Sequence, residues 1–335
     1  MREQNFELVD KFGRKHNYLR ISLTERCNLR CTYCMPPEGV ELGPKSQYMT
    51  ADEILDIASE FVAMGVTKIR LTGGEPLIRK DFEQILRSLA SLNVELAITS
   101  NAVILDKYLD LFKELGVKNL NLSLDSLEME KFNTITRRNY FDKVMSNIQL
   151  FLDEGFRLKI NTVLIKGFND NEIVPFIEWT KDKDIHVRFI EFMPFDGNSW
   201  NMEKMVSLQE IKEVSIGHYT KEKVLRIEDK PNDTAKNFRI EGYEGTFAVI
   251  SSVTNPFCDS CNRIRLTSDG KLKNCLFSSG ESDLLTILRD GGSIRESIKQ
   301  NLAQKLKVRS GKNTLEDFKN EDWHKTNRSM VRIGG

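Results

Sequence analysis

Strand-like and helix-like segments alternate between residues 16 and about 195, and this alternation restricts the fold more than any other feature. Six strands are predicted, at residues 17–24, 66–72, 94–100, 117–125, 157–165 and 185–193. Residues 50–65 form an amphipathic helix pattern that begins with a capping box, Thr50 to Glu53, and ends at Gly65. Such alternation is typical of a parallel sheet with right-handed crossovers. Because six βα units are fewer than the eight of a closed barrel, we expect an α/β fold: an incomplete (β/α)6 TIM-type barrel, open on one side.

The alternation ends after residue 205. Short strand patterns follow at residues 220–230, 236–253 and 261–277, and a helical pattern continues to about residue 306. We therefore predict three regions. They are a partial barrel at 1–205 with an N-terminal cysteine loop, a smaller C-terminal α+β region at 206–310 that closes the open side, and a polar tail at 311–335. The tail is expected to be loosely ordered until it docks.

The predicted strands alternate apolar and polar residues, although parallel strands buried on both faces are usually apolar throughout. An antiparallel sheet with one wet face would show the same alternation, but the intervening helices disfavour it. Successive side chains point to opposite faces, so one face of the sheet is polar and partly cationic. Its members are Arg20, Ser22, Thr24, Lys68, Arg70, Asn119, Asn121, Ser123, Asp125, Lys159 and Asn161. A barrel lumen of this composition suits an anionic small molecule.

The charge balance and hydropathy argue against nucleic-acid and membrane partners. The 49 basic residues equal the 49 acidic ones in number, so no overall field attracts the chain to polyanions. Residues 1–15 lack the apolar core of a signal peptide, and no segment approaches the roughly 20 apolar residues of a membrane helix. We expect a cytoplasmic protein.

All six cysteines fall into two triplets, which are Cys27, Cys31, Cys34 and Cys258, Cys261, Cys275. Stable disulfides are rare in large cytosolic proteins, so we interpret the triplets as metal ligands. Three cysteines with the spacing C-x3-C-x2-C can hold an iron–sulfur cluster with one iron left open. The zinc alternatives are a four-cysteine site made of Cys31, Cys34, Cys258 and Cys261, and a Cys3His site that adds His16.

Two motifs in the barrel region resemble the radical S-adenosylmethionine (radical SAM) superfamily. The first is "CNLRCTYC" at residues 27–34, and the second is "LTGGEP" at residues 71–76. The second cysteine triplet, in "FCDSCNRIRLTSDGKLKNCLF" at residues 257–277, and the terminal Gly334 and Gly335 are similar to the GTP 3′,8-cyclase family within that superfamily. The resemblance covers nearly the whole chain.

The resemblance implies two [4Fe–4S] clusters and S-adenosylmethionine as cofactors. The amino and carboxylate groups of S-adenosylmethionine would complete the first cluster, and its reductive cleavage gives methionine and a 5′-deoxyadenosyl radical. That radical would remove hydrogen from C3′ of GTP, and the carbon radical would attack C8. The product is (8S)-3′,8-cyclo-7,8-dihydroguanosine 5′-triphosphate, in the first step of molybdenum cofactor biosynthesis. The second cluster would contact the guanine ring.

The resemblance also implies individual contacts. For S-adenosylmethionine these are Tyr33, Gly74, Ser123 and Met193, while Gly73 permits close backbone approach. For GTP they are Arg20, Arg70, Thr99, Lys159, Arg263, Ile264 and Arg265, with Lys68 and Arg188 as further cations. Ser100 and Asn101 end the third strand, where barrels bind ligands, and Ala102 replaces the glycine usual in the family. The two terminal glycines would reach into the active site.

The family further implies a homodimer, an electron donor, and transfer of the product to cyclic pyranopterin monophosphate synthase. Three other readings stay open from the sequence. They are a radical SAM enzyme that modifies a peptide or sugar through an auxiliary cluster, a zinc-stabilised nucleotide-binding module, and an electron carrier.

Overall fold

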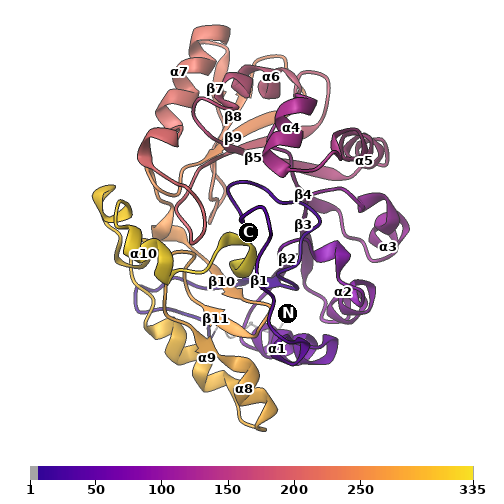
Figure 1. Ribbon diagram of the computed structural model, residues 1–335, viewed down its shortest axis with the longest axis vertical. Coiled ribbons are helices and arrows are strands. Elements are labelled where there is room, and N and C mark those ends of the chain that lie inside the picture. Colours follow the sequence, from indigo (N-terminus) through magenta and orange to yellow (C-terminus); the bar gives the residue numbers. More distant parts are fainter. Residues whose placement is uncertain (1–6, 335) are drawn as a thin grey trace.

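One sheet of twelve strands organises the described residues, 7–334, of this computed structural model (Figure 1). The strand order is β12-β11-β10-β1-β2-β3-β4-β5-β6-β9-β8-β7. Its centre consists of the six predicted strands, which pair in parallel in chain order. They are β1 (Tyr18–Ser22), β2 (Lys68–Thr72), β3 (Glu95–Ser100), β4 (Asn119–Ser123), β5 (Arg157–Leu164) and β6 (Ile185–Glu191). The prediction of a mixed α/β fold built on a parallel sheet is confirmed.

Helices cover the convex face of this sheet (Figure 1). Those of the first part of the chain are α1 (Ala51–Ala63), α2 (Phe82–Ala90), α3 (Leu109–Glu114), α4 (Met129–Thr136), α5 (Phe141–Asp153) and α6 (Ile173–Glu178). Short 3-10 turns connect elements at η1 (Lys45–Gln47), η2 (Pro76–Ile78), η3 (Leu105–Tyr108), η4 (Asp170–Glu172), η5 (Met202–Lys204), η6 (Cys258–Ser260), η7 (Arg309–Gly311) and η8 (Glu316–Phe318).

Helix α1 shows how the local sequence sets an element. Thr50 and Glu53 form the predicted capping box, in which the Thr50 side chain accepts from the Glu53 N–H and the Glu53 carboxylate accepts from the Thr50 N–H at 2.7 Å. The chain leaves the helix through Gly65, whose φ of +109° suits glycine. The helix buries Phe61 completely in the core behind the sheet.

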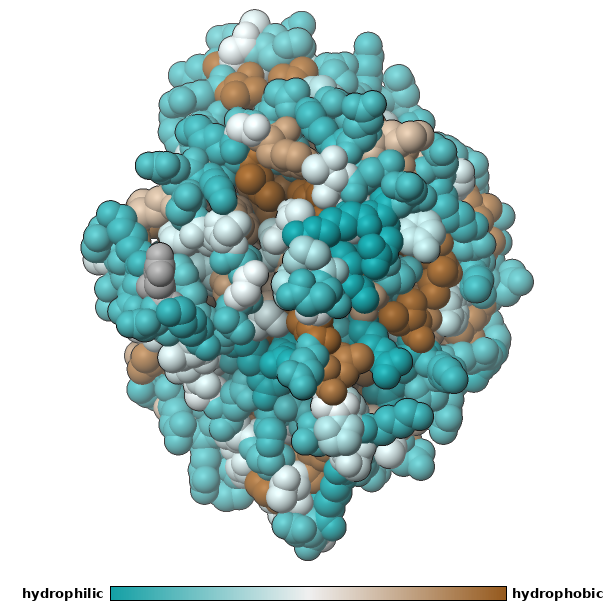
Figure 2. Space-filling model, viewed as in Figure 1, coloured by the Kyte–Doolittle hydropathy of each residue, from teal (hydrophilic) through white to brown (hydrophobic). Residues whose placement is uncertain are grey.

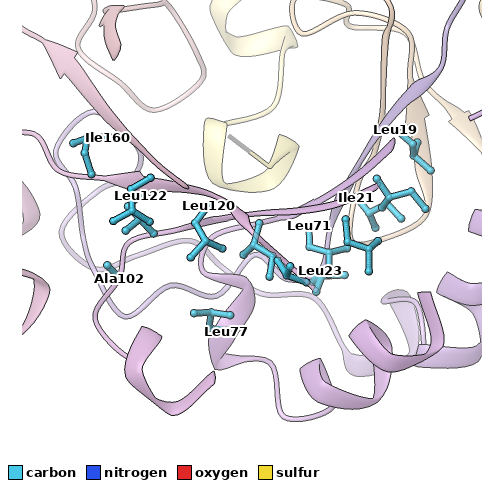
Figure 3. Packing of buried hydrophobic residues seen from close by; sticks show 14 of the residues in the cluster. Leu19, Ile21, Leu23, Leu71, Leu77, Ala102, Leu120, Leu122 and Ile160 are labelled. Atoms are coloured by element: carbon cyan, nitrogen blue, oxygen red, sulfur yellow. The ribbon is translucent and has the colours of Figure 1, made fainter. Parts of the chain in front are cut away.

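The alternation within the strands separates core from cavity. Leu19, Ile21, Leu71, Leu120, Leu122 and Ile160 are fully buried. Figure 3 shows them between the strands and the helices, whereas the C-terminal segment, in yellow, lies across the other face of the sheet. The polar members of the same strands therefore face inward. The predicted polar lumen is confirmed.

The residues after 205 extend the sheet at both edges. They form α7 (Leu208–Tyr219), β7 (Val224–Arg226), β8 (Lys236–Ile240), β9 (Thr246–Ile250), β10 (Arg263–Leu266), β11 (Lys271–Lys273), β12 (Ser282–Asp283), α8 (Leu284–Arg289) and α9 (Ile294–Ala303). We expected an appended region that closes the open side. In the structure this region joins the sheet itself: β9 pairs in parallel with β6, and β10 pairs in parallel with β1. The segment 251–262 runs from β9 to β10, so it crosses the opening and carries Cys258 and Cys261 with it. The boundaries at 205 and 310 stay predictions.

The tail is packed in this structure, although we expected it to be loosely ordered until docked. It contains α10 (Glu321–Thr326) and α11 (Met330–Ile333), and its end lies inside the curve of the strands (Figure 1). Apolar residues within the polar tail account for this: Phe318, Val331 and Ile333 are buried, and the Phe318 ring meets Phe277 edge-on.

The outer surface seen in Figure 2 is mostly hydrophilic, with hydrophobic residues in small separate groups. Within residues 7–334, no helix has both the length and the apolar character that crossing a bilayer requires.

Candidate active site

The polar concave face of the sheet lines a cavity of about 400 Å³. This volume lies in the range of small-molecule sites, roughly 300–1,000 Å³. Both cysteine triplets reach it, as do eight cations, which are Arg20, Lys68, Arg70, Lys159, Arg188, Arg263, Arg265 and Arg309. Of the other predicted contacts, Tyr33, Gly74, Thr99, Ser123 and Met193 also line it. Residues from the N-terminal and C-terminal parts of the chain, including both cysteine triplets, therefore line the same cavity.

Ile264 is the exception among the predicted GTP contacts. Its side chain is 1% exposed and belongs to the hydrophobic core. On a strand, the residue between Arg263 and Arg265 must point to the opposite face. The Ile264 side chain therefore does not line the cavity, and the prediction that Ile264 contacts GTP stays a prediction that only its backbone could fulfil.

The first cysteine triplet lies on a loop that follows β1 and is fixed to the loop after β2. The N–H of Gly74 donates to the carbonyl oxygen of Thr24 at 2.7 Å, and the N–H of Glu75 donates to that of Arg26 at 2.8 Å. A Cβ atom at Gly74 would lie 2.3 Å from the Arg26 oxygen. We expected this glycine to allow the approach of a ligand. In the structure it allows the approach of the chain's own cysteine loop.

The surroundings of the first triplet suit thiolates that a metal cluster would stabilise. The N–H of Leu29 donates to the Cys27 sulfur at 3.4 Å, and the Asn101 amide lies 3.7 Å from it. Burial raises the pKa of Cys27 to about 11, and it also raises the pKa values of Cys31 and Cys34. Buried thiols of this kind ionise when a cation compensates the negative charge, so the donor set fits a cluster.

Two buried carboxylates support this end of the cavity. Glu75 accepts from Ser100 Oγ at 3.0 Å and from the Asn101 N–H at 2.7 Å, and burial raises its pKa to about 7. Asp125 accepts from the Tyr33 hydroxyl at 2.8 Å and from the Val163 N–H at 2.9 Å. Burial raises the pKa of Asp125 to about 6. Asp125 therefore fixes Tyr33, a role that we did not assign from the sequence although Asp125 lies on the predicted polar face.

Ala102 keeps the loop after β3 in a conformation that favours glycine. Its φ is +64°, and its N–H donates to Ser100 Oγ at 3.0 Å. The Asn147 amide donates to its carbonyl oxygen at 2.7 Å. The substitution of the usual glycine therefore leaves this turn formed, at a cost of about 1 kcal/mol for the left-handed backbone.

Three arginines form a row across neighbouring strands. Arg265 on β10, Arg20 on β1 and Arg70 on β2 are register partners in parallel pairs. Partners of this kind point to the same face, and adjacent strands are about 4.8 Å apart. Three positive charges at this spacing repel one another unless an anion lies between them. The row therefore favours a polyanionic ligand, to which guanidinium groups can donate in pairs.

The pKa values of the cations reflect this crowding. Burial lowers the pKa of Arg265 to about 10. Burial and Arg70 lower that of Arg188 to about 9, and burial and Arg188 lower that of Lys159 to about 8. Arg188 Nε and Arg263 NH1 are buried without a hydrogen-bond partner among the described residues. Buried donors without partners are rare, so these two atoms are candidates for ligand contacts.

Tyr18 lies among these cations and was not among the predicted site residues. Its hydroxyl accepts from Arg70 Nε at 2.5 Å, and its ring is contacted by Lys68 at 5.3 Å and by Arg263 at 5.5 Å. Burial alone would raise its pKa, but Arg70 and Arg20 lower it to about 7. Tyr18 follows the same alternation as Arg20, so the strand pattern contained the signal.

The second triplet is assembled from two segments. Cys258 and Cys261 lie on the segment that crosses the opening, and Cys275 follows β11. The N–H of Arg309 donates to the Cys258 sulfur at 3.4 Å, and Lys305 Nζ lies 3.8 Å from the Cys261 sulfur. Burial raises the pKa of Cys258. Burial would also raise the pKa of Cys261. The positive charge of Lys305 and a hydrogen bond from the backbone N–H of Arg263 act in the opposite direction, and the pKa of Cys261 is lowered.

No disulfide joins the cysteines of the structure. All six cysteines are free thiols. Within residues 7–334, no three histidine, cysteine, aspartate or glutamate side chains are arranged to hold a single metal ion. His16 is fully buried and lies 3.1 Å from Asp10 Oδ2, instead of joining a triplet.

The end of the described chain reaches the arginine row. Arg265 NH1 donates to the carbonyl oxygen of Gly334 at 3.0 Å. A Cβ at Gly334 would lie 2.9 Å from the Ser22 side chain, and its φ is +83°. Gly335, the other predicted terminal glycine, lies outside the described residues.

Comparisons with known proteins agree with this geometry. A family model described as the Radical SAM superfamily matches residues 21–180, and one described as Molybdenum Cofactor Synthesis C matches residues 185–314. The chain is 48% identical to "GTP 3′,8-cyclase, mitochondrial" of Arabidopsis thaliana, covering 98% of this chain and 83% of the relative. It is 42% identical to "GTP 3′,8-cyclase" of Listeria monocytogenes, covering 98% and 99%.

Other relatives are longer, and the similarity to solved structures is more distant. The chain spans about half the length of several curated relatives, among them "Molybdenum cofactor biosynthesis protein 1" of Homo sapiens, of which it covers 46%. A crystal structure of Streptococcus suis SuiB bound to S-adenosylmethionine has a TM-score of 0.57 at 17% identity, covering 85% of this chain and 68% of that one. That likeness shows a shared fold, typical of radical SAM partial barrels.

Proposed function

The chain belongs to the GTP 3′,8-cyclase family of radical SAM enzymes in molybdenum cofactor biosynthesis, and we propose that the cavity on the concave face of the sheet holds S-adenosylmethionine at one end and GTP at the other. The observation that carries this proposal is that both cysteine triplets and the arginine row line the same cavity. A nucleoside triphosphate offers a polyanion for the arginines and a base for the second triplet.

We propose the reaction of GTP to (8S)-3′,8-cyclo-7,8-dihydroguanosine 5′-triphosphate, with S-adenosylmethionine converted to methionine and 5′-deoxyadenosine. GTP and this product are isomers, so the reductant supplies one electron for cofactor cleavage and a second, together with a proton, to complete the product. When bound, the first cluster and S-adenosylmethionine supply the radical chemistry.

At the first end, Cys27, Cys31 and Cys34 would hold a [4Fe–4S] cluster. Tyr33, Gly74, Ser123 and Met193 line the cavity beside this loop, and we propose that they contact S-adenosylmethionine. The Asp125 carboxylate holds the Tyr33 hydroxyl. That hydrogen bond orders an aromatic ring before the cofactor arrives, which lowers the entropy cost of binding.

At the other end, the triphosphate would lie over Arg265, Arg20 and Arg70, with Lys159 and Arg188 completing the cation set. Thr99 Oγ1 accepts from Arg70 NH1 at 3.3 Å, so we propose that it aligns this guanidinium for the phosphates. By holding the phosphates, these side chains also keep the sugar and base in place. The tail and the 251–262 segment exclude water from the cavity.

A second [4Fe–4S] cluster at Cys258, Cys261 and Cys275 completes the proposal. Backbone and ammonium donors reach two of these sulfurs, and hydrogen bonds to sulfur are typical around iron–sulfur clusters. We propose that the guanine ring contacts this cluster.

The test is an anaerobic assay of the reconstituted full chain with reductant, S-adenosylmethionine and either GTP or ATP. GTP should yield 5′-deoxyadenosine and an acid-labile cyclised nucleotide, and ATP should not yield the cyclised product. Iron analysis should give about eight irons per chain, and about four after Cys258, Cys261 and Cys275 are replaced by alanine. Intact clusters without either product from GTP would contradict the proposal.

We also propose partners. An electron donor is required by the chemistry, and the family implies a homodimer that passes its product to cyclic pyranopterin monophosphate synthase. The expectation of a cytoplasmic protein rests on the sequence, whereas the Arabidopsis relative is named as mitochondrial.

A further inference from the structure

Lys305 is a buried lysine without an acidic partner. It is 3% exposed and follows α9. Its Nζ donates to the carbonyl oxygens of Arg263, at 3.2 Å, and Asn274, and lies 3.8 Å from the Cys261 sulfur. Among residues 7–334, no carboxylate forms an ion pair with it. A buried ammonium is costly unless an opposite charge compensates it.

The three acceptors of Lys305 all belong to the second triplet or its neighbours. Cys261 is a member of the triplet, and Asn274 immediately precedes Cys275. Arg263 begins β10, beside the arginine row. One ammonium group therefore links both segments that carry these cysteines. Because no carboxylate of the described residues pairs with it, its compensating negative charge would come from the cysteine sulfurs.

Nearby positive groups differ from Lys305 in how they contact the second triplet. Arg14 donates to the carbonyl oxygen of Cys258 at 2.7 Å and to that of Lys307 at 2.8 Å, which holds residues 305–309 against the triplet. However, Arg14 is paired with Asp10 at 2.6 Å. Arg309 reaches Cys258 through its neutral backbone N–H. In the part of the chain that the structure describes, Lys305 is thus the cationic side chain that contacts a triplet sulfur directly.

The first triplet has a different electrostatic setting. The groups that donate to Cys27 are neutral, namely the Leu29 N–H and the Asn101 amide. The charged side chains that lie deepest beside this triplet are carboxylates, Glu75 and Asp125, both at most 3% exposed. Arg30 is also close to this triplet, but its guanidinium donates to the backbone carbonyl oxygen of Cys27, at 2.6 Å, and not to a sulfur. A buried ammonium therefore contacts a sulfur of the second triplet, whereas the sulfur contacts of Cys27 are neutral.

We propose that Lys305 is the counter-ion of the second triplet and raises the reduction potential of the [4Fe–4S] cluster there; this inference rests on the proposed second cluster. One-electron reduction makes a thiolate-bound cluster more negative, so an adjacent positive charge stabilises the reduced state. A cluster held by Cys258, Cys261 and Cys275 would then be reduced more easily than it would be without the Lys305 charge. Lys305 acts through the cluster, as a positioning residue.

The test measures the second cluster alone. In a full-length chain with Cys27, Cys31 and Cys34 replaced by alanine, the cluster is titrated with reductant and followed by electron paramagnetic resonance. Lys305→Gln keeps N–H donors for the two carbonyls but removes the charge, whereas Lys305→Arg keeps the charge. Lys299→Gln is the matched control, because Lys299 lies on the exposed side of α9 and pairs with Glu7.

Lys305→Gln should disfavour reduction by about tenfold or more, which corresponds to a fall of about 59 mV for one electron. Lys305→Arg and Lys299→Gln should keep the parent potential. Loss of iron in Lys305→Gln but not in Lys305→Arg also supports the inference, because both variants keep N–H donors and only the arginine keeps the positive charge. An unchanged potential in Lys305→Gln, or loss of iron in both variants, overturns it. A parent without about four irons would instead refute the second cluster itself.

Discussion

Arg20 and Arg265 stand opposite each other on the parallel pair β1 and β10, with their side chains on the same face of the sheet. One lies near the start of the chain and the other near its end. Their pairing joins the partial barrel to the C-terminal region at the point where the cation row lies, and Arg70 on β2 extends it. The proposed GTP site is therefore created by the pairing of distant strands.

Replacement of one arginine in this row should weaken GTP binding. A charge-assisted hydrogen bond contributes about 1.5–3 kcal/mol, so Arg20→Gln should raise the Kd for GTP about ten- to hundredfold. Binding is measured by anaerobic calorimetry. The control is Arg87→Gln, at an exposed arginine paired with Glu83 and Glu114. Equal effects of both substitutions would contradict the assignment.

Tyr18 should make the cavity sensitive to pH. Its pKa is lowered to about 7, because Arg70 and Arg20 outweigh the opposing effect of burial, whereas an unfolded tyrosine titrates near pH 10. The stabilisation is therefore complete above about pH 10 and is lost as the pH falls through about 7. Relative to Tyr18→Phe, the ligand-free protein should gain unfolding free energy between about pH 6 and about pH 9, measured by denaturant titration.

GTP binding should show the reverse trend, because phenolate and triphosphate compete for the same cations. The Kd for GTP of the parent should rise as the pH increases above about 7, and that of Tyr18→Phe should change less. Tyr140→Phe, at an exposed tyrosine, serves as control. Parallel pH profiles for the parent and Tyr18→Phe would show that Tyr18 does not titrate in this range.

The alternation of the strands predicted the polar face because a two-residue period depends on local geometry alone. It placed Arg20, Arg70 and Lys159 together before any tertiary contact was known. The same rule should have revealed Tyr18, and it shows why Ile264 points away. The pairing of β9 and β10 with the sheet edges could not be predicted, because short strands carry no signal for distant partners. Lys305 was missed because a lysine at a charged helix end normally faces water.

Asp125 should control cofactor binding through Tyr33. Asp125→Asn removes the negative charge and one acceptor, so the Tyr33 hydroxyl loses part of a charge-assisted hydrogen bond worth about 1.5–3 kcal/mol. The Kd for S-adenosylmethionine should rise about tenfold, measured by equilibrium binding to the reconstituted chain. GTP affinity should be unchanged, since Asp125 lies away from the cation row. Asp153→Asn, at an exposed residue of α5, is the control. Normal cofactor binding with a displaced Tyr33 would refute this role.

Gly74 should be required for binding of the first cluster, because a side chain at this position would collide with the backbone of the cysteine loop. The Cβ atom of Gly74→Ala would lie 2.3 Å from the Arg26 carbonyl oxygen, and no flexible side chain can move to relieve this contact. The loop that begins at Thr24 must shift, and Cys27 shifts with it. Overpacking of this kind costs about 1–3 kcal/mol, so the thermal midpoint should fall. Iron content should fall from about eight to about four per chain, as the second triplet is untouched.

Gly217→Ala provides the matched control. Gly217 lies in α7, has no atom within 4 Å of a built Cβ, and has an ordinary backbone angle. Alanine is the better helix former by about 1 kcal/mol, so this variant should be as stable as the parent or more so, with all its iron. The two substitutions add the same methyl group and differ only in what it meets. If Gly74→Ala also kept about eight irons and the parent's thermal midpoint, the cysteine loop would not depend on its contact with the loop after β2.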